Sequence, residues 1–174
     1  MRHIGIALIF CLLGMPTAFA ASDTIPPQAL KAGRFVQMKI DGLACPFCLY
    51  GIRKQLGKLK GTDGLDASFK NSEATIWIRP GSPTRMADVY LAVKNAGFKV
   101  SEFTITDAGH VKLSGDTLIF TSLTNGEQFQ ILGEKADRPH FMCSLTGTIT
   151  EIPEDARKLP AIRIVPGKMK IFLP

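Results

Sequence analysis

The sequence predicts an α+β protein in which a βαββαβ unit is followed by a small all-β unit. Three observations predict this class. Short runs alternate apolar and polar residues, two segments between them repeat apolar residues at helical spacing, and after residue 105 only alternating runs remain. The chain has 174 residues, 45% of them hydrophobic. That length suits one medium domain or two small ones.

The first 20 residues have the pattern of a cleaved signal peptide. A basic start, an apolar run over residues 4–13 and the triplet "AFA" precede a predicted cut before Ala21. The run is shorter than the roughly 20 residues that a membrane span needs. We therefore expect a periplasmic or secreted protein with no membrane span after signal cleavage. A Pro-containing linker over residues 21–33 should precede the first folded domain.

That first domain is expected over residues 34–105, and it opens with a strand and a helix. In "RFVQMKI" apolar and polar residues alternate, which is typical of a half-buried strand. From Cys48 to Leu59 the apolar residues recur every three or four positions, as on one face of a helix. Pro46 fits the first turn of this helix, where a missing N–H leaves no hydrogen bond unmade.

Two more strands, a second helix and a fourth strand complete the domain. "LDASF" and "ATIWI" alternate on either side of a polar turn at residues 70–73. In the next segment Ser82 is the expected N-cap, Pro83 the first helical residue and Gly97 the C-terminal stop. "FKVSEFTI" returns to an extended pattern. The resulting βαββαβ order is the split-βαβ or ferredoxin-like motif.

Residues 106–174 are predicted to form a small β-domain. "HVKLSGDTLIFTSLTNGEQFQIL" has the pattern of hairpin strands with turns at Gly115-Asp116 and Asn125-Gly126. "HFMCSLTGTITEI" and "AIRIVPGKMKIF" supply further strands. We expect a small barrel of the OB type, because such a barrel closes its edges with few strands.

Cys45 and Cys48 form a Cys-x-x-Cys pair where the first strand gives way to the first helix. A helix N-terminus favours thiolate over thiol, and thiolate pairs select soft ions such as Cu(I). Structural zinc takes four ligands, and the sequence has no second Cys-x-x-Cys and no spaced histidine pair. The sequence thus favours a two-sulfur metal clamp, and a redox dithiol or a small disulfide remain as alternatives.

The run "GLACPFC", followed by the helical spacing and by "AVKNAGF" at residues 92–98, resembles the heavy-metal-associated domain family. Its members include copper chaperones, N-terminal domains of copper ATPases and periplasmic mercury-binding proteins. The resemblance covers residues 35–105. It implies a ferredoxin-like fold, a metal ion held at its edge by Cys45 and Cys48, and a position near the metal loop for Phe98.

The sequence departs from that family at three points. Leu43 stands where the family usually has methionine, and this apolar side chain should still pack under the loop. "CPFC" is closer to the active-site tetrapeptides of glutaredoxin-like oxidoreductases, which keeps the redox alternative open. Ala44 stands where zinc- and cadmium-selective members often have an acidic residue, which favours Cu(I) or Hg(II).

A second cluster of metal-binding residue types lies in the β-domain. "RPHFMCSL" brings His140, Met142 and Cys143 together in the sequence, and in a strand Cys143 would point away from the other two. Methionine and cysteine in a β-domain are usually core residues. His110 has no evident partner in the sequence. The segment is therefore only a possible second metal site.

The function expected from the sequence is that of an exported binding protein or metallochaperone for a soft metal ion, Cu(I) or Hg(II). It would hold the ion with the Cys-x-x-Cys clamp and transfer it by thiolate ligand exchange. Its partners would be metal donors or acceptors, including a membrane transporter, and the net charge of +6 could assist docking to an acidic protein. Nucleic acid is a poor partner for an exported chain. The sequence contains no nucleophile elbow, no paired-histidine zinc motif and no phosphate loop, so it does not predict an enzyme. The alternatives are a periplasmic thiol–disulfide protein using the CPFC dithiol and a non-catalytic adaptor acting through its β-domain.

Overall fold

A computed structural model describes residues 33–135, 139–152 and 160–172. The expected signal peptide and nearly all of the expected linker lie outside these residues. The described helices and strands follow one another as β1 (Arg34–Asp41), α2 (Pro46–Leu56), β2 (Thr62–Ser68), β3 (Glu73–Ile78), α3 (Met86–Asn95), β4 (Lys99–Ser114), β5 (Thr117–Ser122), β6 (Gln128–Leu132), β7 (His140–Glu151) and β8 (Ala161–Phe172).

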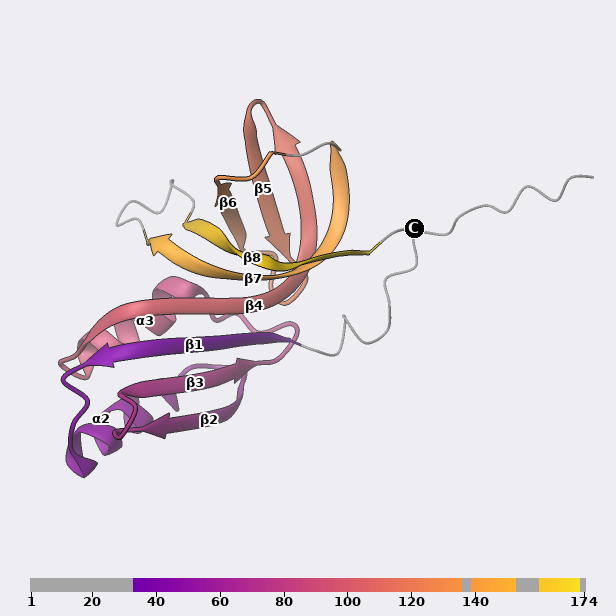
Figure 1. Cartoon of the computed structure of the whole chain (residues 1–174). Coiled ribbons are helices and arrows are strands. Elements are labelled where there is room, and N and C mark those ends of the chain that lie inside the picture. The colour runs from indigo at the N-terminus through magenta and orange to yellow at the C-terminus, as the bar shows by residue number, and fades with distance from the viewer. Residues whose placement is uncertain (1–32, 136–138, 153–159, 173–174) are drawn as a thin grey trace, which may run out of the picture.

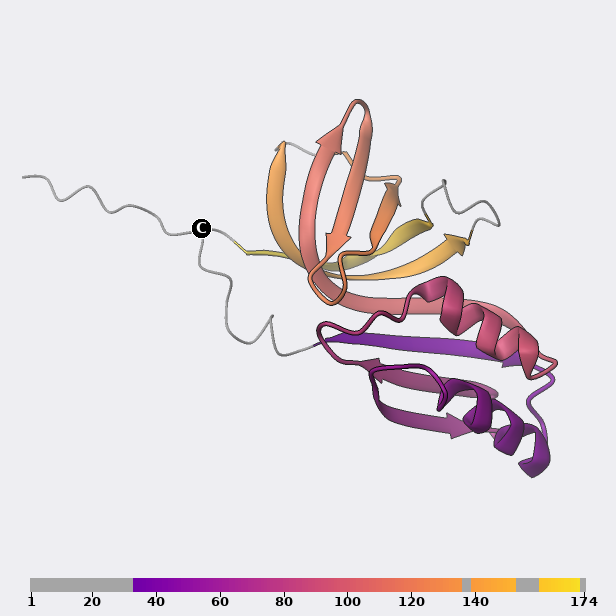
Figure 2. The ribbon, with the colours of Figure 1, turned by 180° about the vertical axis from the view of Figure 1, so that it is seen from behind.

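The first six elements form the predicted βαββαβ unit. Their strands lie in the order β2-β3-β1-β4, and every neighbouring pair is antiparallel. Both helices cover the same face of this sheet, as Figure 2 shows from behind. Neither described helix is long and apolar enough to cross a membrane.

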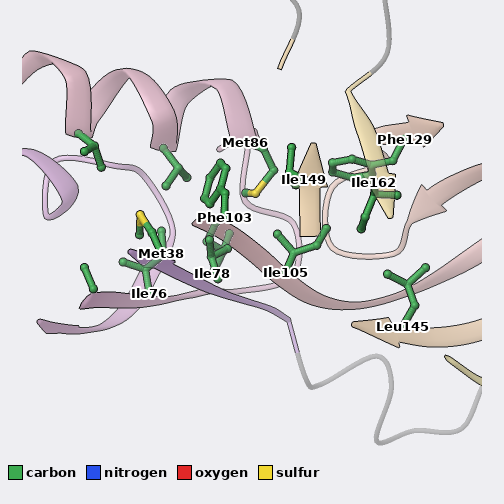
Figure 3. Packing of buried hydrophobic residues seen from close by; sticks show 14 of the residues in the cluster. Met38, Ile76, Ile78, Met86, Phe103, Ile105, Phe129, Leu145, Ile149 and Ile162 are labelled. Carbon is green, nitrogen blue, oxygen red and sulfur yellow. The ribbon is translucent and has the colours of Figure 1, made fainter. Parts of the chain in front are cut away.

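The core of this unit lies between the sheet and the two helices. Alternate residues of β1 and β3 are buried on the helical face, which is the alternation that the sequence predicted. Figure 3 shows several of these side chains beneath α3. The buried apolar residues are Val36, Met38 and Ile40 of β1, Ala74, Ile76 and Ile78 of β3, Ile52 and Leu56 of α2, and Met86, Val89, Ala92 and Val93 of α3.

The second unit is a closed five-stranded barrel that shares β4 with the first. After pairing with β1, strand β4 continues into the barrel, whose strands lie in the order β4-β5-β6-β8-β7, and β7 closes the circle by pairing with β4. All these pairs are antiparallel except β6–β8, which is parallel. Figure 1 shows β4 passing from the sheet into the barrel. It crosses the boundary expected between residues 105 and 106 without a break.

A buried ionic network connects the two units. Arg34 at the start of β1 is fully buried, and its Nε donates a hydrogen bond of 2.8 Å to Asp107 of β4. Its guanidinium also pairs with Glu127, between β5 and β6. Ser122 and Thr124 donate hydrogen bonds of 2.6 Å and 2.9 Å to the Asp107 carboxylate. A buried charge costs several kcal/mol unless it is paired and hydrogen-bonded, so these partners make the burial of Arg34 tolerable.

The second helix begins later than the sequence predicted, so the assignment of Ser82 as its N-cap was wrong. The helix starts at Met86, whose N–H donates a hydrogen bond of 3.0 Å to the Glu127 carboxylate. Ser82 instead accepts a hydrogen bond from the Thr84 N–H and donates one of 2.7 Å to the Lys60 carbonyl. The barrel therefore supplies the acceptor at this helix start, and no local sequence pattern could indicate that. Gly97 stands just after the helix with φ of 87°, as predicted for its C-terminal stop.

Candidate metal or redox site

The loop that carries the cysteines begins where β1 ends. Gly42 has φ of 78°, a left-handed conformation that glycine adopts without steric cost, and turns the chain away from the sheet. Leu43 is completely buried, so it packs under the loop as expected for the residue at this position. The hydroxyl of Ser72, in the β2–β3 turn, donates a hydrogen bond of 3.3 Å to the Leu43 carbonyl. The burial of the Leu43 side chain and the hydrogen bond from Ser72 thus fix the position of the loop.

Cys45 is the N-cap of α2, and Pro46 occupies the first helical position, as the sequence predicted. The Cys48 N–H donates a hydrogen bond of 3.1 Å to the Cys45 sulfur. The first turn of α2 contains no acidic side chain. The positive end of the helix dipole therefore acts on the Cys45 sulfur without an opposing carboxylate in that turn, which favours its thiolate form once the pair is reduced.

The two cysteines form a disulfide in this structure, with their Cα atoms 5.1 Å apart. Both side chains are half-buried at the start of α2. The bond shows that the loop holds both sulfur atoms side by side at the start of the helix. The same proximity serves either a metal ion held between two thiolates or a reversible redox pair.

The surface around the pair is apolar and open. Phe47, between the cysteines, is 88% exposed, and Tyr50 one turn later is 67% exposed. Exposed apolar area that forms a contiguous patch is typical of a surface that another molecule covers. Arg53 and Lys54 follow in the last turn of the same helix. The strand register pairs Asp41 with Lys99, so Phe98 lies at the same end of the sheet as the start of the loop.

The structure separates the residues of the possible second site. Cys143 lies inside the barrel and is fully buried, whereas His140 and Met142 are on the outer face of β7. In the β4–β7 register His110 lies opposite Met142, and its ring stacks on that of His140. These neighbours of His110 were not predicted from the sequence. His110 was missed because its neighbours are about 30 residues away along the chain and meet it only through the β4–β7 register.

Within the three described stretches, no three or more His, Cys, Asp or Glu side chains gather as they would around a metal ion. Two thiolates form a donor set for a soft ion such as Cu(I), whereas structural zinc takes four ligands.

No family model and no curated protein matches the sequence. Solved structures do match part of the fold. A copper-binding domain from HMA7, a P-type ATPase, is 19% identical, with a TM-score of 0.36, over 39% of this chain and 90% of that domain. The CopZ metallochaperone is 17% identical, with a TM-score of 0.35, over 38% of this chain and 97% of its own. The yeast copper transporter domain Ccc2a is 24% identical, with a TM-score of 0.36, over 39% of this chain and 92% of its own.

Proposed function

We propose that this protein is an exported carrier of a soft metal ion, Cu(I) or Hg(II), which it binds with Cys45 and Cys48 and passes to a partner protein. The observation that carries the proposal is the meeting of both sulfur atoms at the exposed start of α2, where the Cys48 N–H points at the Cys45 sulfur. The sequence resemblance to heavy-metal-associated domains supports the same assignment. The signal-like start of the chain supports export.

Metal uptake requires the reduced pair. Two electrons and two protons from a thiol reductant convert the disulfide into two thiols, and binding of Cu(I) to both sulfur atoms releases the two thiol protons. Transfer then proceeds by ligand exchange. A thiolate of the partner adds to the two-coordinate ion, after which the bond to Cys45 or Cys48 breaks and that sulfur takes up a proton. A second exchange completes the transfer.

The exposed residues beside the pair suit this exchange. Phe47 and Tyr50 offer apolar area that a partner protein can cover while its thiolate reaches the metal ion. A metal donor or acceptor, such as the metal-binding domain of a membrane transporter, is the class of partner that this chemistry requires.

For the barrel, we infer the OB type. Its strand order β4-β5-β6-β8-β7, closed by β4–β7 and with a parallel β6–β8 pair, supports that assignment. Because one barrel type serves many functions, the fold by itself assigns none to this one.

Titration with Cu(I) against a competing chelator tests the metal proposal. The full chain is first reduced with a thiol reductant and then freed of it under anaerobic conditions. We expect the Cys45→Ser/Cys48→Ser variant to hold one copper ion fewer per chain than the native protein. Cys143→Ala removes a thiol at a distance from the pair and should retain the native copper number. An unchanged copper number in the double variant would overturn the proposal.

The second candidate is a thiol–disulfide protein, and the disulfide at a helix N-terminus is the observation that favours it. The same protein samples distinguish the two candidates. Reduction of insulin disulfides by the reduced native protein, together with an unchanged copper number in the double variant, would establish the redox function. Loss of one copper ion without insulin reduction would establish the metal function.

A further inference from the structure

The outer face of the barrel carries a cluster of three residues that bind metals in other contexts: His110, His140 and Met142. His110 on β4 lies directly opposite Met142 on β7, and Lys112 lies opposite His140. Val111 and Cys143, which alternate with them along the two strands, are buried inside the barrel. Because successive side chains of a strand point to opposite faces, the three cluster residues share the outer face.

The two imidazole rings of this cluster are close enough to share one ion. Their centroids are 5.6 Å apart and the rings are stacked, with an angle of 10° between their planes. Because an imidazole nitrogen binds a metal ion in the plane of its own ring, one ring has to turn about its Cβ–Cγ bond before both can hold the same ion. Two imidazoles that bind the same ion through bonds of about 2 Å have centroids no more than about 6.5 Å apart. The His110 Nδ1 atom is buried and has no hydrogen-bond partner among the residues that the structure describes. A buried polar atom without a partner is uncommon in folded proteins and calls for a ligand or a water molecule.

We infer that this cluster binds one Cu(I) ion through an imidazole nitrogen of His110, an imidazole nitrogen of His140 and the thioether sulfur of Met142. Thioether sulfur selects Cu(I) among the biological metals, and imidazole is a common copper ligand. These three ligands carry no negative charge.

The charges beside the cluster also favour a monovalent ion. Three further residues lie opposite the cluster in the neighbouring strands. Lys112 lies opposite His140, Thr121 lies opposite His110, and Phe172 lies opposite Met142. None of these partners is a carboxylate, and the Lys112 ammonium repels a divalent ion about twice as strongly as a monovalent one. Zn(II) and Cu(II) are therefore disfavoured relative to Cu(I).

This inference goes beyond the proposed function, because the barrel site needs no thiol. Copper could remain bound there when Cys45 and Cys48 are joined as a disulfide. Figure 1 shows α2 at the lower left, beside β2 and β3, and the barrel strands at the top, so the two sites lie on separate parts of the molecule. They can therefore be tested independently.

The test uses the full-length Cys45→Ser/Cys48→Ser variant, in which the thiol pair cannot contribute. Cu(I) is added anaerobically in ascorbate and competed with bicinchoninate. We expect one ion per chain, and a dissociation constant raised about tenfold or more by His140→Gln and by Met142→Leu. Met169→Leu removes a thioether from β8 and should leave the dissociation constant unchanged. Far-UV circular dichroism checks that each variant is folded.

Nuclear magnetic resonance adds a measurement that does not depend on competition. On addition of Cu(I), the ring protons of His110 and His140 and the terminal methyl group of Met142 should shift, and the methyl group of Met169 should not. The inference is overturned if the double serine variant holds no Cu(I), or if Met142→Leu binds as tightly as its parent. A double serine variant without copper, beside a native protein that holds one ion, would leave the Cys45–Cys48 proposal intact. One ion in both would instead favour the barrel site alone.

Discussion

Cys143 has a different chemical character from the two cysteines at the start of α2, and burial is the reason. Its thiol is fully buried in the barrel. Burial, and to a smaller extent the negative charge of Asp107, raise the pKa of Cys143 from its ordinary value of 9.0 to about 12. Since the thiolate is the reactive form, the native protein keeps this cysteine unreactive at neutral pH.

The raised pKa of Cys143 predicts a loss of stability in alkali. Below pH 9 the thiol is protonated in both the folded and the unfolded chain, so its contribution to stability is constant. Between pH 9 and pH 12 only the unfolded chain loses the proton, and the free energy of unfolding falls by up to about 1.4 kcal/mol per pH unit. Urea unfolding at pH 8, 9 and 10, in the Cys45→Ser/Cys48→Ser background that prevents thiol exchange, measures this decline. Adding Cys143→Ala should make it shallower, and equal slopes would contradict the prediction.

At the scale of single helices and strands, two glycines illustrate opposite requirements. Gly51 lies inside α2, and a Cβ atom there would meet no other atom within 4 Å. Gly147 lies in β7, and a Cβ atom there would come within 2.6 Å of the Ile162 side chain and 2.9 Å of the Arg163 carbonyl oxygen. The glycine in the helix is replaceable, whereas the glycine in the barrel permits β7 and β8 to pack closely.

Alanine substitutions test this difference. Gly51→Ala should raise the free energy of unfolding by about 0.5–1 kcal/mol, because alanine loses less conformational freedom in a helix. Gly147→Ala should lower it by about 1–3 kcal/mol through overpacking. Denaturant unfolding of both variants beside the native protein gives the two values. A stabilising Gly147→Ala would show that β8 moves away at little cost.

At the scale of the whole molecule, we expect the sheet and the barrel to unfold together, because they share β4 and the Arg34 network. Arg34→Met should lower the free energy of unfolding by about 3–5 kcal/mol, since Asp107 and Glu127 would stay buried without their cation. Arg79→Met is the control, because its pair with Asp63 is exposed and such pairs contribute about 0–1 kcal/mol. Equal effects of the two substitutions would contradict the role of the network.

The fluorescence of Trp77, the single tryptophan, and far-UV circular dichroism should report the same unfolding transition in the native protein.

The parts of this fold that the sequence predicted are those determined by nearby residues. Val36, Met38 and Ile40 alternate within one strand, and Pro46 starts a helix whose apolar face follows directly. The turns at Gly115-Asp116 and Asn125-Gly126 were likewise predicted from short motifs, and they connect β4 to β5 and β5 to β6. Local propensity and pattern were sufficient for each of these.

The parts that the sequence did not predict depend on residues far apart in the chain. Arg34 meets Asp107 and Glu127 across 73 and 93 positions, so no local pattern marks these charges as partners. His110 and His140 meet only because β7 closes the barrel against β4. For the cysteine pair, the sequence predicted its place at the helix start. Its oxidation state depends on the surrounding redox conditions, which the sequence does not encode.

The closure of the barrel by β7 also has a consequence for self-association. If the β4–β7 and β6–β8 pairings opened, β4 and β6 would expose unpaired edges that match the β7 and β8 of any other copy of the same chain. Two copies could then exchange their β7–β8 segments and close each other's barrels, as in domain swapping. The exchanged dimer would keep every native strand pair and would carry two cysteine loops. Under the proposed function, it would engage a partner with two metal-binding domains more tightly than one copy can.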